Sequence, residues 1–120
     1  MILADTSIWI RHFREANYLL SEELLRGQVS THRFILGELA CGNLPSRQQT
    51  LLYFSNLPMA ATCLDKEVMF LIERHDLMGT GIGYIDAHLL ASAIVNDHKL
   101  WTTDKRLEEI ACSLNVGFVE

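Results

Sequence analysis

MILADTS, residues 1–7, is the stretch that decides the fold of this chain. Its uninterrupted apolar run, residues 1–4, is typical of a strand buried on both faces, as strands of parallel sheets are. Asp5 follows directly, and Thr6 and Ser7 can cap a helix that begins near Ile8. The stretch therefore predicts a buried strand that ends in a carboxylate and turns into a helix.

The same arrangement recurs near the end of the chain. Residues 99–104 read KLWTTD, which predicts a second buried strand with Asp104 at its end and a helix that starts at Lys105. Strands and helices alternate between these points, with no linker, low-complexity tract or internal repeat. This alternation predicts an α/β fold with a parallel sheet covered on both sides, formed by one domain over residues 1–120.

The other elements follow from apolar spacing and turn residues. Pro58 restricts its strand to an edge of the sheet, because proline cannot donate a ladder hydrogen bond. The glycine-rich residues 79–83 predict a flexible loop. Helices are expected over about residues 8–15, 18–26, 34–42, 46–54, 65–78 and 84–95, with a last one after Asp104, and strands over residues 1–4, 28–31, 57–62 and 99–104.

Glu38 is the third acid in an apolar context. It follows Phe34 by four residues and Ile35 by three, and on a helix these positions share one face. We therefore expect Glu38 to point inward. A buried ion pair with Arg33 or Arg74 is the alternative, because buried charges pair.

Asp86 is the fourth. Leu89 and Leu90 lie three and four residues after it, so it too shares an apolar helical face, in a first turn where the helix dipole favours an anion. Capping a helix is the simpler interpretation for Asp86 or for Asp104 taken alone.

One shared site explains the four acids together better than four separate accidents. An ionised carboxylate beside a core is costly unless it is paired or bound to a metal. In parallel α/β sheets the functional crevice lies beyond the carboxyl ends of the strands, where Asp5 and Asp104 are expected. Glu38 and Asp86 need only flank that edge. Clustered carboxylate oxygens suit Mg²⁺ or Mn²⁺, and phosphodiester hydrolysis is the natural chemistry.

The bulk composition is compatible with such a site. The formal net charge is −5, and the four acids contribute four of these negative charges, so the rest of the chain is nearly neutral and nucleic acid is not excluded as a ligand. No stretch approaches the roughly 18 apolar residues of a membrane span, and no signal peptide precedes the first strand. A cytoplasmic protein is expected.

The cysteines and histidines indicate no second site. They show neither a C-x-x-C motif nor a histidine pair spaced by four residues, so buried structural thiols and mostly solvated imidazoles are expected. The residues concerned are Cys41, Cys63 and Cys112, and His12, His32, His75, His88 and His98.

The four acidic segments resemble a known family. DTS at residues 5–7, Glu38 in a helix, GYIDAHLLA at residues 83–91 and LWTTDKRL at residues 100–107 resemble PIN-domain ribonucleases, most closely the VapC toxins of bacterial toxin-antitoxin systems. The resemblance covers the whole chain. It implies a PIN-like α/β/α sandwich with a central parallel sheet of four to five short strands.

The resemblance also implies an activity. Asp5, Glu38, Asp86 and Asp104 would hold Mg²⁺ or Mn²⁺ and orient the water that attacks RNA, which makes the chain a metal-dependent endoribonuclease. Ser7 and Thr102 would hydrogen-bond the carboxylates on the side away from the metal and thereby orient them. The family implies a homodimer and a cognate VapB-type antitoxin. Basic residues near the site are candidates for RNA contacts, namely Arg11, Arg14, Lys105 and Arg106.

Three questions stay open at this level. Some family members carry another acid just after the last motif aspartate, whereas here Glu108 is the nearest, so one or two metal ions are compatible with the sequence. A PIN-like domain could also be an inert RNA-binding or assembly module. A haloacid-dehalogenase-type phosphatase would need a second aspartate where Ser7 stands.

Overall fold

Three parallel strands form the centre of the protein. The computed structural model describes all residues from Met1 to Glu120. The strand order is β2-β1-β3, with β1 (Ile2–Ala4) between β2 (Val29–Ser30) and β3 (Lys99–Trp101). The expected α/β fold with a parallel sheet is confirmed. The helices are α1 (Thr6–Arg14), α2 (Tyr18–Leu25), α3 (Arg33–Cys41), α4 (Arg47–Ser55), α5 (Asp65–Arg74), α6 (Tyr84–Asn96) and α7 (Lys105–Ser113).

The sheet has fewer strands than the four to five that were expected. Only single parallel bridges extend it, Thr31 to Met59 beside β2 and Leu100 to Gly117 beside β3. The Thr31 N–H donates to the Pro58 carbonyl at 2.8 Å, and the Ala60 N–H donates to the Thr31 carbonyl at 2.8 Å. Pro58 has no N–H of its own, so the pairing ends after one bridge and no edge strand develops.

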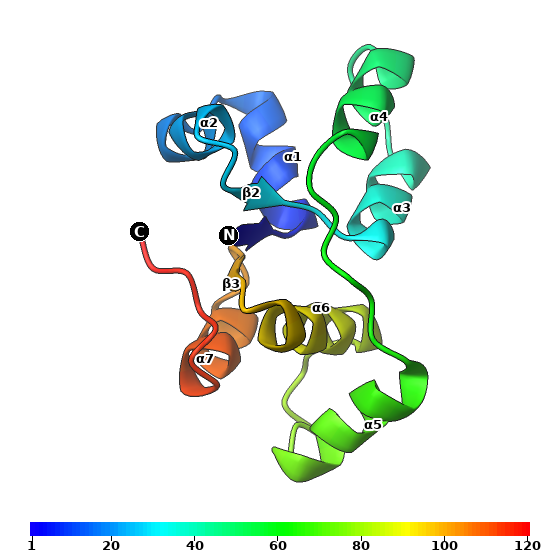
Figure 1. Cartoon of the computed structure of the whole chain (residues 1–120), viewed down its shortest axis with the longest axis vertical. Helices are drawn as coiled ribbons and strands as arrows, with labels where there is room; N and C mark the ends of the chain where they lie inside the picture. Colours follow the sequence, from blue (N-terminus) through cyan, green and yellow to red (C-terminus); the bar gives the residue numbers. More distant parts are fainter.

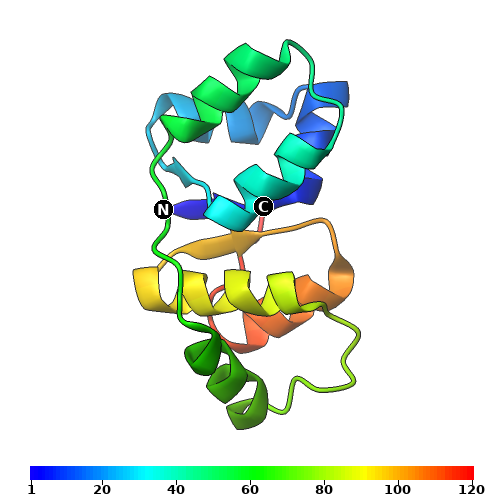
Figure 2. The same ribbon diagram turned by 90° about the vertical axis from the view of Figure 1, so that its right-hand side faces the viewer.

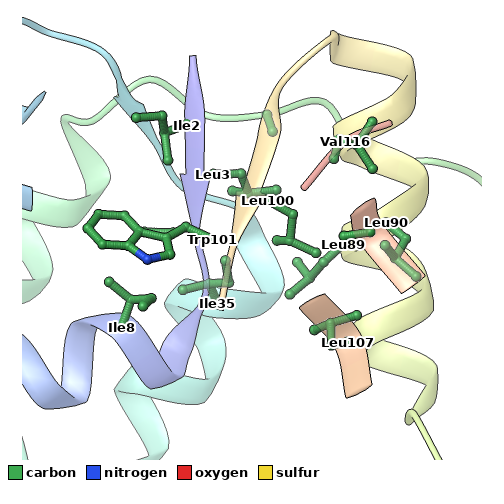
Figure 3. Packing of buried hydrophobic residues seen from close by; sticks show 14 of the residues in the cluster. Ile2, Leu3, Ile8, Ile35, Leu89, Leu90, Leu100, Trp101, Leu107 and Val116 are labelled. Carbon is green, nitrogen blue, oxygen red and sulfur yellow. The ribbon is translucent and has the colours of Figure 1, made fainter. Parts of the chain in front are cut away.

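Helices cover the strands from both sides. α1 to α4 lie in one half of the molecule together with β2, and α5 to α7 lie in the other half beside β3 (Figures 1 and 2). In the core, Ile8 and Trp101 lie on one side of β1 and β3, whereas Leu89 and Leu107 lie on the other (Figure 3). Trp101 is 2% exposed and Leu107 is fully buried, so both faces of the sheet are covered by buried apolar side chains.

Two helices differ from the expected ranges. α1 begins at Thr6 rather than Ile8, because Asp5 itself is the N-cap and its side chain accepts from the Ile8 N–H. α5 ends at Arg74 rather than near Met78, and Asp76 then takes the left-handed conformation at φ 52°. A helix cannot continue through that conformation.

The expectations for histidine and cysteine are wrong. His32 and His88 are buried, and only His75 of the five histidines is exposed. Cys41 and Cys112 are exposed, and all three thiols are free. The longest helix, α6, has 13 residues, and none of the helices has the length and apolar character to span a membrane.

Candidate active site at the carboxyl edge of the sheet

Asp5 lies directly after β1 and is 6% exposed. Its Oδ1 accepts hydrogen bonds from the Ile8 N–H at 3.2 Å and from the Ser7 hydroxyl, and its own N–H donates to the Trp101 carbonyl at 2.9 Å. Burial raises the pKa of the Asp5 carboxyl above its ordinary value, although hydrogen bonds from Ser7 and Thr102 act in the opposite direction. Asp5 is therefore a buried carboxylate fixed at the end of the central strand.

Asp104 occupies the matching position after β3, but it is exposed. It is the N-cap of α7, and its Oδ1 accepts from the Arg106 N–H at 2.9 Å and the Leu107 N–H at 3.2 Å. Its own N–H donates to the Thr102 hydroxyl at 3.1 Å. The capping interpretation is thus correct, and because both bonds end at Oδ1, the second carboxylate oxygen is free to bind a ligand.

Ser7 connects the two strand ends. Its hydroxyl donates to Asp5 and accepts from the Thr103 N–H at 3.0 Å. Since β1 and β3 pair side by side, with Ala4 opposite Trp101, Asp5 and Asp104 emerge at the same edge. Ser7 hydrogen-bonds a carboxylate as the family resemblance implied.

Glu38 lies at this edge but does not point into the core. It is exposed, whereas Ile35 and Leu39 form the buried side of α3, so the expectation that it points inward is wrong. Glu38 Oε1 accepts from the Thr6 hydroxyl at 2.8 Å. The expected alternative, an ion pair with Arg33 or Arg74, is absent, because the only ion pairs are Arg26 with Glu23 and His88 with Asp65.

Asp86 is half-buried in the first turn of α6. Its Oδ2 accepts from the Gly83 N–H at 3.2 Å. Burial is the main cause that raises the pKa of the Asp86 carboxyl, and the negative charges of Asp5 and Asp104 raise it further. Asp86 therefore lies near enough to Asp5 and Asp104 for their charges to influence it.

The four acids share one edge of the sheet without forming a finished metal-binding cluster. No group of three or more acidic, histidine or cysteine side chains is arranged to hold a metal ion. Like charges repel, and all four carboxylates are also held in hydrogen bonds, Asp5 by Ser7 and Ile8 and the others by Thr6, Gly83 and the start of α7. The donor chemistry nevertheless fits Mg²⁺ or Mn²⁺, since all four groups are carboxylates and hard cations prefer oxygen.

The basic candidates lie in three different surroundings. Arg11 and Lys105 line a groove of about 460 Å³ that also includes Thr102 and Thr103, the two residues before Asp104. Glu108 and Glu120 line it too, whereas the four site acids do not. Arg14 lines a smaller hollow of about 250 Å³ that contains Glu38. Arg106 donates to the Thr80 carbonyl at 2.8 Å. None of the four basic side chains forms an ion pair with an acid.

Tyr84, His88 and Asp65 form a polar cluster next to Asp86 that the sequence did not lead us to expect. The Tyr84 hydroxyl donates to Asp65 Oδ1 at 2.8 Å, and His88 Nε2 lies 3.1 Å from the same oxygen. Tyr84 and His88 are four residues apart, so they share one face of α6, and this spacing was the available signal. The cluster joins α5 to the turn of α6 that carries Asp86.

Comparisons with known proteins agree with this geometry. A family model described as PIN domain matches residues 2–112. The chain is 39% identical over 121 aligned positions to "Ribonuclease VapC32" of Mycobacterium tuberculosis strain CDC 1551 / Oshkosh, and the alignment covers 100% of this chain and 98% of the relative. The same protein from strain ATCC 25618 / H37Rv gives the same identity and coverage.

Proposed function

This chain belongs to the PIN-domain family, and from that premise we propose that it is an endoribonuclease, the toxin of a VapBC-type toxin-antitoxin pair. The full-length likeness to ribonuclease VapC32 supports the activity. The observation that supports the proposal is the pairing of β1 with β3, which brings Asp5 and Asp104 to one sheet edge, where Ser7 links the two strand ends. Glu38 accepts a hydrogen bond from Thr6 beside Asp5, and the charges of Asp5 and Asp104 help to raise the pKa of Asp86. We further propose that residues 1–120 form one domain, since the buried apolar side chains make a single cluster.

Asp5, Glu38, Asp86 and Asp104 are the residues that would hold Mg²⁺ or Mn²⁺. A divalent cation in this place supplies positive charge that makes water easier to deprotonate and offsets the charge that develops on a phosphate. The free oxygen of Asp104 and the exposed Glu38 carboxylate can turn towards a ligand without breaking the core.

The side chains of the site would position the attacking water and the RNA phosphate. One carboxylate accepts a proton from the attacking water, and the water oxygen forms a bond to phosphorus. The bond from phosphorus to the ribose oxygen on the opposite side breaks, and this oxygen leaves with the bonding electrons and takes a proton from solvent. Ser7 and Thr102 keep Asp5 oriented, and the Thr103 N–H keeps Ser7 oriented in turn.

A chelator and a Glu38 variant test this function. Purified protein is expected to cut RNA internally, and EDTA is expected to stop the cleavage until Mg²⁺ or Mn²⁺ is restored. Glu38→Gln should lower the rate by roughly tenfold to 100-fold, by analogy with altered ligand surroundings in other metal sites. Gln still accepts the Thr6 hydrogen bond, so the melting temperature should not change.

Glu73→Gln is the matched control, because it removes an exposed carboxylate from α5 and should cut RNA at the wild-type rate. RNA that is bound but never cut would instead indicate the inert RNA-binding module. Cleavage that persists in EDTA would contradict the metal-dependent mechanism.

The groove lined by Arg11 and Lys105 is the proposed path of the RNA backbone. Its two cations form no ion pair, and Lys105 directly follows Asp104, so they suit phosphate groups near the cleaved bond. Glu108 and Glu120 line the same groove. Arg11→Ala or Lys105→Ala should raise KM roughly tenfold with little change in kcat. Binding should also become less salt-dependent, by about 0.7 in the log–log slope for each lost contact to a single strand.

Arg26→Ala serves as the control for this prediction. Arg26 precedes β2 at the opposite edge of the sheet and pairs with Glu23, so its loss should change neither KM nor the salt dependence. Equal effects of all three substitutions would show that the groove is not the RNA path.

The partners belong to the same proposal. A cognate VapB-type antitoxin and a homodimer both require apolar surface, and Met69 and Phe70 on α5 together with Ile94 and Val95 on α6 are exposed. Light scattering on the purified chain measures the mass that decides between monomer and dimer. A cytoplasmic location stays a prediction, supported by the cellular RNA that the enzyme would cut.

A further inference from the structure

The loop before α6 contains three glycines at alternate positions, Gly79, Gly81 and Gly83. Gly79 has φ 72° and Gly81 has φ 91°, and both values lie in the region that favours glycine. Glycine loses more conformational freedom on folding than any other residue, so such a loop needs an anchor to hold one shape. The loop matters because Gly83 is the N-cap of the helix that carries Asp86.

Arg106 supplies the anchor from α7. Its Nη1 donates to the Thr80 carbonyl at 2.8 Å. The side chain also lies close to Gly81, where a Cβ atom would collide with the guanidinium group. Thr80 is held in turn, because its hydroxyl donates to the Leu77 carbonyl at 2.6 Å. Arg106 forms no ion pair with an acid, so its guanidinium group interacts with this loop.

The backbone of the same residue contacts the site directly. The Arg106 N–H donates to Asp104 Oδ1 at 2.9 Å, whereas its side chain reaches Thr80, six residues before Asp86. Arg106 thus joins the two elements that carry Asp86 and Asp104. The buried residues 87–93 hold the body of α6 in the core, so this link fixes the loop and the start of the helix, where Asp86 lies.

We propose that Arg106 is a positioning residue that clamps the loop of residues 79–83 and thereby sets the spacing of Asp86 and Asp104 for cation binding. The metal part of this inference rests on the proposed function, but the clamp itself does not. It assigns Arg106 a role different from the RNA contact that the sequence suggested. Gly81 belongs to the same contact, because glycine adopts φ 91° without strain and leaves room for the guanidinium beside the backbone.

Hydrogen–deuterium exchange on the metal-free protein tests the clamp. In Arg106→Ala, the hydrogen-bonded amides of this loop and of the start of α6 should exchange at least about tenfold faster than in the wild type. These are the amides of Thr80, Gly83 and Ala87. Gly81→Ala should also loosen the loop, since alanine is strained at φ 91° and its Cβ would meet the guanidinium. Arg106→Lys should restore part of the protection, because an ammonium group can still donate to Thr80.

Titration with Mn²⁺ alone, followed by melting temperature, tests the positioning. The Mn²⁺ concentration that gives half of the stabilisation should rise about tenfold in Arg106→Ala. Lys105→Ala removes the same charge one residue earlier and should change neither the exchange nor the Mn²⁺ midpoint.

Three outcomes separate the possibilities. Unchanged exchange in Arg106→Ala overturns the clamp. Faster exchange with an unchanged Mn²⁺ midpoint overturns the positioning of the acids. A wild-type protein that neither binds Mn²⁺ nor cuts RNA overturns the proposed function and the positioning with it, and faster exchange in Arg106→Ala would then support the clamp alone.

Discussion

Asp5→Asn is expected to abolish RNA cleavage and to make the metal-free protein more stable. Asn keeps the oxygen that accepts from the Ile8 N–H and from Ser7, so the cap of α1 survives. The substitution removes a charge that is 6% exposed and repels Asp86. Cleavage should fall by more than about 100-fold, since even partners behind metal ligands contribute about 10- to 100-fold.

The gain in stability depends on pH with a definite sign. Burial raises the pKa of Asp5 in the folded protein above its ordinary value of 3.8. The folded state therefore holds this proton to higher pH, and the stability this provides is complete below pH 3.8 and lost as pH rises through the raised pKa. Asn has no such loss, so the variant and the wild type should be similar in acid and differ by about 1 kcal/mol at neutral pH.

Urea unfolding in EDTA at several pH values measures this difference, and an RNA cleavage assay measures the activity. Asp97→Asn removes one exposed charge from the far end of α6 and should keep wild-type cleavage. If Asp5→Asn cuts RNA at the wild-type rate, Asp5 is not part of the active site. One that is less stable than the wild type at neutral pH would mean that the buried charge is compensated.

The strand-end acids could be predicted because their signals are local. Asp5 and Asp104 each follow a short apolar run, and a parallel sheet brings such ends to one edge. Glu38 shows the limit of the same reasoning. Only Ile35 and Leu39 of α3 are buried, so the apolar stripe is narrow, and a residue next to it can face solvent although its neighbours in the pattern are apolar.

Long-range contacts were beyond the reach of the sequence. The hydrogen bond from Arg106 to Thr80 joins residues 26 positions apart, and nothing in either local pattern predicts it. The strand count failed for a similar reason. Residues 57–62 have apolar character, but how far they pair depends on their register with β2, and Thr31 opposite Met59 forms the single bridge.

His32 is the buried histidine with the largest expected effect on stability. Its Nδ1 accepts from the Phe34 N–H at 3.0 Å, and its Nε2 lies 3.0 Å from the Ser92 hydroxyl. The neutral ring uses both nitrogens, and a protonated ring would lose the acceptor that caps α3. Burial, followed by the nearby His88 and Arg33, lowers the pKa of His32 from 6.5 to about 4.

We expect this histidine to make the fold sensitive to mild acid. Because the folded pKa is depressed, the stabilisation is complete above pH 6.5 and is lost as pH falls towards about 4. The loss over this range should approach about 3 kcal/mol, on the basis of about 1.4 kcal/mol for each pKa unit. His32→Asn cannot titrate, so it should be less stable at pH 7.5 yet lose less stability on acidification.

Urea unfolding at pH values from 7.5 to 4.5 checks the expectation, and the difference between wild type and variant isolates His32. The raised pKa values of Asp5 and Asp86 and the lowered ones of His12 and His98 influence both proteins equally, so they cancel in that difference. His75→Asn replaces an exposed imidazole and should follow the wild-type curve. Parallel curves for wild type and His32→Asn would mean that the ring is protonated as easily in the folded chain as in the unfolded one.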